Sequence, residues 1–189
     1  MTREKLLDLF SNLHVWKQRG VRAPHKPLLL LLALGRVANQ EERLVPYTRI
    51  EGRMEKLLRR FGPLRQKHHP EFPFGRLPSD SLWVISGSET LSRTSSGDLL
   101  VSELRELGVK GGFPELVHEL LFRHPALLQE AAQGLLDAHF PDTWHDEIRI
   151  ATGIPFTWVV RETPQRRRDP AFRRRVLREY QYRCAVCNY

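Results

Sequence analysis

Apolar residues recur at helical spacing through most of the chain, and this pattern predicts a mostly helical protein. The segment Leu28–Leu34 is apolar on every side, which is typical of a helix buried in the core. Short apolar runs bounded by turn residues predict two strands, Phe74–Leu77 and Leu82–Ile85, that pair as a hairpin. The remaining expected elements are a short extended segment over 43–47, a strand over 154–160, and helices over residues 3–18, 27–37, 48–61, 102–107, 114–122, 125–138, 142–151 and 170–180.

The expected fold class is therefore α+β and predominantly helical, a helical domain with a small β-hairpin in a winged-helix-like arrangement. Two prolines and a glycine in the stretch 70–75 argue against a helix there, because proline breaks the interior of a helix.

Charge is distributed unevenly along the 189 residues, whose formal net charge is +8. Residues 1–84 carry a net charge of +8, residues 85–160 one of −6 and residues 161–189 one of +6. A basic half beside an acidic middle indicates a surface that binds a polyanion, although charged blocks are also common as solvated faces. The sequence shows no signal peptide, no apolar run near the roughly 20 residues of a membrane span and only two cysteines, so we expect a cytoplasmic protein.

Two loop segments combine cations with rigid apolar side chains. In the first, Pro24 and Pro27 flank His25 and Lys26 directly before the buried helix. The second runs over residues 64–77 and adds aromatic rings, prolines, histidines and further cations. Proline and phenylalanine lose little entropy when held in place, so these segments could build a small preformed cavity with a cationic rim. Such a site would suit an anion with a poorly hydrated, polarisable part, such as a phosphate in which sulfur replaces one non-bridging oxygen.

These two segments, their spacing, and the motifs Ser81-Leu82-Trp83 and Gly111-Gly112-Phe113 resemble the sulfur-binding domain of type IV HNH restriction endonucleases that depend on phosphorothioate DNA. The resemblance covers about residues 20–155. It implies double-stranded DNA carrying phosphorothioate linkages as the partner, and neither a membrane nor a small-molecule ligand. It also implies a sulfur-binding domain over residues 1–160, a basic linker over 161–169 and the truncated start of an HNH nuclease domain over 170–189.

The resemblance further implies which residues bind the modified linkage. Sulfur would pack in a shallow apolar cavity formed by Pro24, His25, Lys26, Leu30, Phe72 and Pro73, completed by either Gly75 or Arg76. Many relatives have tyrosine where this chain has Phe72, and a small residue shortly after the proline. Contacts with the DNA backbone or bases would come from Arg22, Lys26, Arg65, Lys67, His68, His69 and Arg76.

A phosphorothioate linkage and an ordinary phosphate linkage are both anionic. The protein must therefore distinguish them by hydration rather than by charge. In an apolar cavity the phosphate oxygen loses its hydrogen bonds to water, and no protein group replaces them. Sulfur accepts hydrogen bonds poorly and so loses little. One such pocket is worth about 1–3 kcal/mol, or roughly 10- to 200-fold in affinity.

Cys184 and Cys187 have the spacing of half a zinc site, which needs four ligands. We expect zinc and a divalent metal only in an intact HNH domain, and no cofactor in this chain. The chain as given is not expected to cleave DNA, whereas an intact parent is expected to be an HNH restriction endonuclease.

Two other functions stay open at this point. A generic winged-helix-like DNA-binding or regulatory module that reads unmodified duplex would share the basic N-terminal half and the hairpin. A metal-dependent nuclease complete in these residues would need paired carboxylates near the basic loops, and the sequence offers none there. The adjacent His68 and His69 lack the spacing of a dedicated metal site, and His25 has no evident nucleophile to activate.

Overall fold

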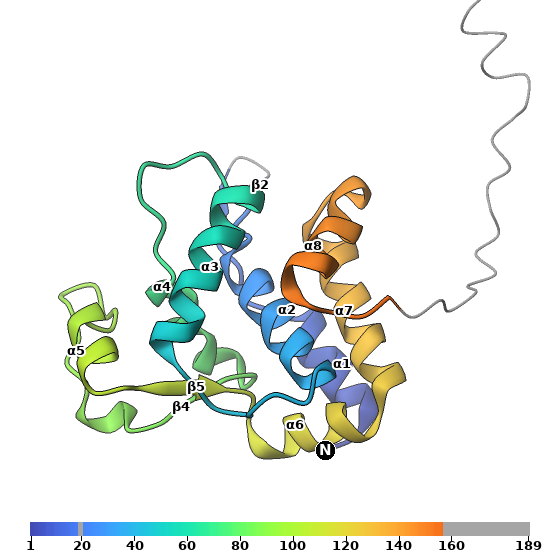
Figure 1. The fold of residues 1–189 in the computed structure, drawn as a ribbon, viewed down its shortest axis with the longest axis horizontal. Coiled ribbons are helices and arrows are strands. Elements are labelled where there is room, and N and C mark those ends of the chain that lie inside the picture. Colours follow the sequence, from blue (N-terminus) through green and yellow to red (C-terminus); the bar gives the residue numbers. More distant parts are fainter. Residues whose placement is uncertain (19–20, 157–189) are drawn as a thin grey trace, which may run out of the picture. The chain divides into compact units, whose positions relative to one another are not determined.

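Helix α2 (His25–Ala38) lies at the centre of the fold, as its continuous apolar sequence requires (Figure 1). The computed structural model describes residues 1–18 and 21–156. Every residue of Leu28–Leu34 is buried, and α2 packs against helices α3, α4, α6, α7 and α8. A helix that is covered on all sides can be apolar on all sides, and its first turn is consequently held in a fixed place.

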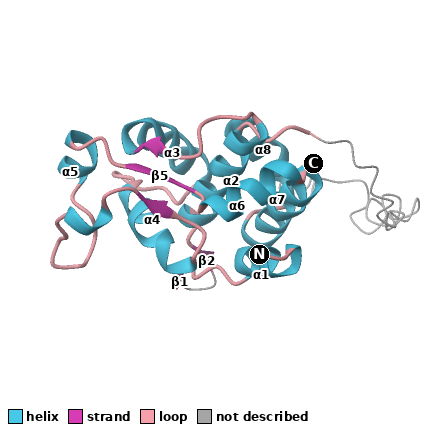
Figure 2. Ribbon diagram, turned by 90° about the horizontal axis from the view of Figure 1, so that it is seen from below, coloured by secondary structure: helices cyan, strands magenta, loops and turns pink. Residues whose placement is uncertain are grey.

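The described part of the chain consists mostly of helices, with a small three-stranded sheet and a two-stranded one, so the fold is α+β and mostly helical (Figure 2). None of the described helices is long and apolar enough to cross a membrane. The other α-helices are α1 (Arg3–Ser11), α3 (Tyr47–Phe61), α4 (Glu71–Arg76), α5 (Val101–Glu106), α6 (Glu115–Arg123), α7 (Pro125–His139) and α8 (His145–Thr152). Short 3-10 helices are η1 (Leu77–Asp80), η2 (Ser88–Thr90) and η3 (Asp142–Trp144).

Three short antiparallel strands form the sheet in the order β3 (Val45–Pro46), β5 (Lys110–Gly112), β4 (Val84–Ile85). Gly111 stands opposite both Val45 and Ile85. A Cβ on Gly112 would overlap the carbonyl oxygen of Arg43, and one on Gly111 would lie 2.6 Å from the Phe74 ring. The central strand therefore depends on glycine, because its neighbours approach the backbone too closely for a side chain.

The expected hairpin of residues 74–77 with 82–85 is wrong. Residues 71–76 form helix α4, and β4 pairs with β5 instead. Pro70 is the N-cap of α4 and Pro73 occupies its third position, where the backbone amide has no partner within the helix. Proline is therefore tolerated here, although the same residues had argued against a helix.

Other boundaries also differ from the sequence-based expectation. Helix α1 ends at Ser11 rather than at residue 18, and strands β1 (Lys17–Gln18) and β2 (Val21–Arg22) pair antiparallel beyond it. Helix α2 begins at His25 rather than at Pro27, which places His25 and Lys26 in its first turn. Residues 154–156 are not a strand, and residues 157–160 lie outside the described residues.

Candidate nucleic-acid interface

Helices α2 and α4 begin with the same arrangement of two prolines. Pro24 and Pro70 are the N-cap residues, and Pro27 and Pro73 occupy the third helical position. All four rings are buried. Because their torsion angle φ is fixed by the ring and their surroundings are packed, both helix starts are rigid.

The two helix starts share one electrostatic environment. Helix α4 packs against α2, which brings together the two segments that the sequence singles out. Burial, together with the nearby basic groups of Arg65, His68, His69 and Arg76, lowers the pKa of His25 to about 4. His25 is consequently a neutral ring at neutral pH, placed within the field of four other basic groups.

Phe72 forms an aromatic shelf at the start of α4. The His69 ring stacks on it with 4.6 Å between ring centroids and 8° between planes. The guanidinium carbon of Arg76 lies 4.5 Å from the same ring centroid. Nδ1 of His69 also lies 2.7 Å from Oε1 of the buried Glu71, which fixes the imidazole beside the shelf. Planar groups therefore already cover part of the phenyl surface that was expected to pack sulfur.

Asp98 holds Arg76 in its place over the shelf. The guanidinium donates from Nε to Oδ1 at 2.6 Å and from Nη2 to Oδ2 at 2.7 Å. These hydrogen bonds hold the pKa of the Asp98 carboxyl below its usual range and raise the pKa of Arg76. The Arg76 side chain is 53% exposed and that of Asp98 only 7%, so a buried carboxylate anchors a guanidinium at the surface.

Lys26 faces into the protein rather than toward solvent. Its ammonium group pairs with the carboxylate of Asp80, the last residue of η1. The Lys26 side chain is 14% exposed and that of Asp80 is 2% exposed. The backbone amide of His14 also donates to Oδ1 of Asp80 at 2.9 Å. The charge of Lys26, which the sequence reasoning assigned to DNA, is thus offset by an internal partner.

The remaining predicted cavity residues lie at different depths. Leu30 is fully buried, and Pro73 is buried in the first turn of α4. A Cβ at Gly75 would lie 3.3 Å from the Leu99 side chain, so this glycine faces Leu99. Of the two residues left open by the sequence, Arg76 is therefore the one whose side chain borders Phe72.

Arg65 and Lys67 are exposed on the segment between α3 and α4, and neither forms an ion pair with a described residue. Nδ1 of the neighbouring His68 is buried and has no hydrogen-bond partner within residues 1–18 and 21–156. Arg22 lies on β2, and its side chain is outside what the structure describes. Cys184 and Cys187 lie outside the described residues, as do the expected linker and nuclease segments.

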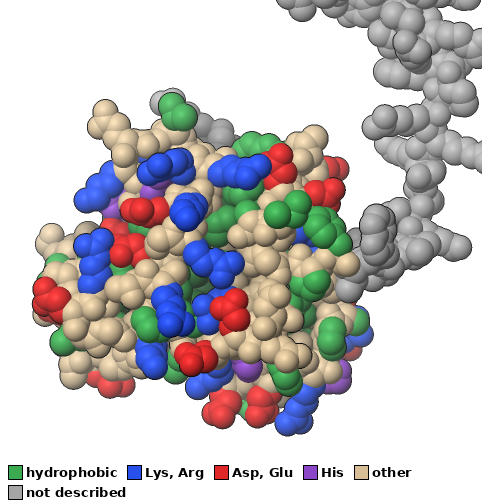
Figure 3. All heavy atoms as spheres, in the orientation of Figure 1, with side chains coloured by type: hydrophobic (Ala, Val, Ile, Leu, Met, Phe, Trp, Pro, Cys, Tyr) green, Lys and Arg blue, Asp and Glu red, His purple; other side chains and the backbone are tan. Residues whose placement is uncertain are grey.

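Lys and Arg side chains gather on the face of the molecule that carries α3 and the segment after it (Figure 3). The α3 members of this group are Arg49, Lys56, Arg59 and Arg60, all exposed. The sequence reasoning did not assign these cations to the DNA-binding surface. The signal was present, because these cations oppose the buried apolar stripe of an amphipathic helix.

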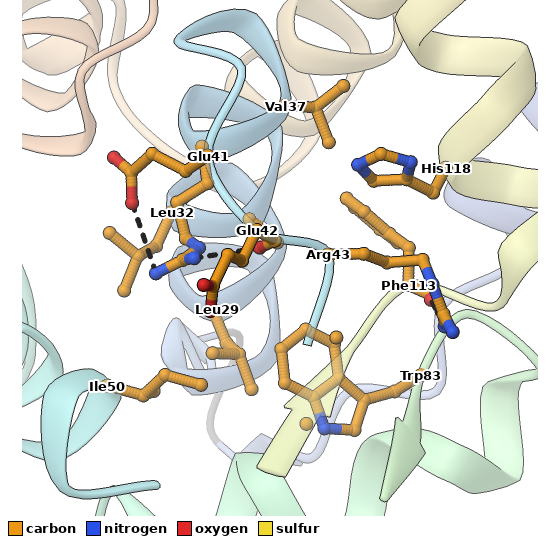
Figure 4. A pocket seen from close by; sticks show the side chains of 14 residues that line it. Leu29, Leu32, Val37, Glu41, Glu42, Arg43, Ile50, Trp83, Phe113 and His118 are labelled. Carbon is orange, nitrogen blue, oxygen red and sulfur yellow. Dashed lines mark hydrogen bonds and ion pairs between the residues drawn. The ribbon is translucent and has the colours of Figure 1, made fainter. Parts of the chain in front are cut away.

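A groove of about 310 Å³ borders the shelf. It is lined by His69, Glu71 and Phe72 on one side and by residues 94–101, including Asp98, on the other, and its lining does not include Pro24, His25 or Lys26. A separate cavity of about 10 Å³ lies between α2 and the sheet, beside Trp83 and Phe113 (Figure 4). That cavity has the size of about one water molecule, too small for a nucleotide.

Comparison with known proteins identifies the relatives of this chain. No curated protein sequence matches it. The sulfur-binding domain of ScoMcrA complexed with phosphorothioated DNA superimposes with a TM-score of 0.69 at 24% identity, covering 78% of this chain and 94% of that one. The sulfur-binding domain of SprMcrA complexed with phosphorothioated DNA gives 0.67 at 25% identity, covering 81% and 94%.

A longer relative is the type IV phosphorothioation-dependent restriction endonuclease ScoMcrA, with a TM-score of 0.67 at 23% identity over 78% of this chain and 32% of that one. The family model of the ScoMcrA-like DNA sulfur-binding domain matches residues 3–155. The chain therefore belongs to the ScoMcrA-like family of DNA sulfur-binding domains.

Proposed function

We propose that this chain binds double-stranded DNA at phosphorothioate linkages, packing the sulfur against apolar groups at the starts of α2 and α4. One observation carries the proposal: two proline-framed helix starts meet in a single basic neighbourhood, where the pKa of His25 is lowered by its own burial and by four surrounding basic groups. Membership of the sulfur-binding family and the DNA complexes of the structural relatives support it.

The finer description of the fold as winged-helix-like belongs to the same proposal. The α-helices and strands follow in the order α2, β3, α3, α4, β4, α5, β5, with β5 between the other two strands of the sheet. Apart from α5, which is inserted between β4 and β5, this order resembles that of a winged helix and supports the description. In helix-turn-helix proteins the first helix crosses the DNA backbone and the second enters the major groove. By that analogy α3 would bring its exposed cations to the phosphates, and α4 would approach the bases with Phe72 near its start.

In this proposal, one group of side chains provides affinity for DNA and another provides the preference for sulfur. Arg65, Lys67 and the α3 cations attract either linkage equally and make binding fall with salt. Phe72, which is only partly buried, supplies apolar surface that penalises the oxygen more than the sulfur, and the buried rings of Pro24 and Pro73 hold the two helix starts in place. Within an intact parent, the domain would direct an HNH nuclease to modified DNA, the role that the endonuclease relative suggests.

A competition between two duplexes of identical sequence, differing by one sulfur atom, tests the proposal. The wild-type chain should prefer the modified duplex by roughly 10- to 200-fold, the range that a single apolar pocket provides. Phe72→Ser and Pro73→Ser should reduce this ratio. Equal affinity of the wild type for both duplexes would contradict sulfur recognition and favour a winged-helix-like module that reads ordinary duplex.

Phe122→Ser provides a matched control. Phe122 is likewise a phenylalanine stacked on a histidine, His118, with 9° between the ring planes, but it is exposed and lies on α6. The ratio of affinities should be unchanged in this variant. A reduced ratio in Phe122→Ser as well would mean that the competition reports general damage rather than loss of the shelf.

A further inference from the structure

The Arg76–Asp98 ion pair lies at the edge of the aromatic shelf. DNA binding alone does not explain why the charge of Arg76 is neutralised there. A cation beside a DNA site gains affinity when it is free to reach phosphate, yet the fork of this guanidinium is occupied by two short hydrogen bonds to one carboxylate. The carboxylate belongs to a different part of the chain, the segment that leads into α5. The pairing therefore needs an explanation in terms of what a free Arg76 would do.

Asp98 is held in position by its own turn. Its backbone amide donates to Oγ1 of Thr94 at 3.1 Å, and its carbonyl accepts from the Thr94 amide at 2.8 Å. Ser96 donates its hydroxyl to Oδ2 of Asp98 at 3.2 Å, and Gly97 adopts a φ of +82° that closes the turn. A carboxylate fixed in this way acts as a rigid anchor, so little entropy is lost when Arg76 binds to it.

A free guanidinium at this place would favour oxygen over sulfur. Hydrogen bonds from a guanidinium to an anionic oxygen are short and strong, whereas sulfur is a weak acceptor. An unrestrained Arg76, already 4.5 Å from the Phe72 centroid, could follow the phosphate and replace the hydrogen bonds that the apolar surface removes from oxygen. That gain would cancel part of the penalty on which discrimination depends.

We propose that Asp98 is a specificity-determining positioning residue: it holds the Arg76 guanidinium over the Phe72 ring so that Arg76 cannot stabilise an unmodified phosphate in the sulfur site. The inference rests on the proposed function. Paired with Asp98, Arg76 contributes a neutralised charge to the wall of the site. Asp98 contacts no DNA in this scheme and acts only through Arg76.

Asp98→Asn tests the proposal in the full-length chain, with the affinities for modified and unmodified duplex measured separately. Asparagine keeps the size of the side chain but removes the charge that holds the guanidinium. The variant should bind unmodified duplex roughly tenfold more tightly, the value of one hydrogen bond to a charged group. The modified duplex should gain less, so the preference for sulfur should fall by at least about threefold, since sulfur accepts hydrogen bonds weakly.

Arg76→Gln, alone and combined with Asp98→Asn, separates positioning from bulk charge. If Asp98 acts through Arg76, Asp98→Asn should have no effect on the unmodified duplex when Arg76 is already replaced. If the gain persists without Arg76, Asp98 merely repels DNA and the proposal is overturned. An unchanged preference in Asp98→Asn overturns it as well, whereas a wild type without sulfur preference would instead overturn the proposed function.

Glu51→Gln is the matched control for releasing an arginine. Glu51 holds Arg105 through the same two-bond geometry, at 3.0 and 2.9 Å, and the Arg105 side chain is 56% exposed, close to the value for Arg76. This pair joins α3 to α5, and neither residue lines the groove beside Phe72. The sulfur preference should be the same as in the wild type, and a thermal melt of each variant checks that the fold is retained.

Discussion

Replacing Lys26 by methionine should lower the stability of the folded protein, and not only its affinity for DNA. The change removes the ammonium group but keeps most of the aliphatic stem. It leaves the carboxylate of Asp80, 2% exposed, without its ammonium partner, although the exposed imidazole of His14 stays beside it, with Nδ1 3.2 Å from Oδ1. Removing one partner of a buried ion pair costs about 3–5 kcal/mol, because the remaining charge is left desolvated.

The lower end of that range applies here. Asp80 keeps the hydrogen bond from the His14 amide at 2.9 Å, and Lys26 retains 14% exposure. We therefore expect a loss of about 3 kcal/mol in the free energy of unfolding. For a domain of this size, this corresponds to a fall in melting temperature of roughly 6–12 °C.

Urea unfolding of four proteins measures the effect: wild type, Lys26→Met, Asp80→Asn and the double variant. Because the introduced asparagine would still accept from the His14 amide and carries no charge, the double variant should recover to within about 1 kcal/mol of the wild type. Lys67→Met is the control, since this exposed lysine has no ion-pair partner among the described residues and should change stability by less than about 0.5 kcal/mol. A cost below about 1 kcal/mol for Lys26→Met, together with a weaker salt dependence of DNA binding, would refute the buried pair and return Lys26 to the DNA surface.

Three further predictions follow from the same geometry. Arg65→Ala should weaken modified and unmodified duplex equally and reduce the slope of log affinity against log salt by about 0.9, as expected for one lost phosphate contact; a changed sulfur preference would argue against this role. Because the pKa of His25 is lowered in the folded state to about 4, the unfolded state takes up its proton first as the pH falls below about 6.5, and stability is lost between these values. His25→Gln should remove roughly 1–2 kcal/mol of that acid sensitivity, allowing for solvent screening of a partly exposed ring, and identical pH profiles would contradict the assignment. Gly112→Ala should destabilise the fold strongly because its Cβ would overlap the carbonyl of Arg43, whereas Gly52→Ala, with open space around it on α3, should be neutral or stabilising by up to about 1 kcal/mol in thermal melts.

The helices that the sequence predicts well are those with a strong apolar stripe. Helix α3 was expected over residues 48–61 and spans Tyr47–Phe61, with Ile50, Met54 and Leu57 buried as the spacing requires. Helix α4 was missed because two prolines and a glycine were read as helix breakers, although a proline at the N-cap or in the first turn breaks no hydrogen bond. Strand β5 includes two glycines and carries almost no hydrophobic signal, so its pairing with segments far along the chain depends on packing that no local pattern encodes.

The candidate site was likewise predicted only in part from the sequence. The meeting of the two proline-containing segments was expected, and α2 does pack against α4. The two aspartates that control the cations were not expected. Asp80 and Asp98 lie in turn-like sequence among serines and glycine, where aspartate is common for local reasons. Their importance becomes evident only when Lys26 and Arg76 are seen to point at them.

The pairs of prolines at the starts of α2 and α4 affect how anions can bind there. The beginning of a helix normally offers several unpaired amides, which is why phosphate groups so often bind there. In each of these helices, the imino nitrogens at the N-cap and the third position cannot contribute, and the Phe72 amide is already directed to the His69 carbonyl at 3.2 Å. Both helix starts therefore offer few hydrogen bonds to an oxyanion. Sulfur, which needs little solvation, loses less there than oxygen does.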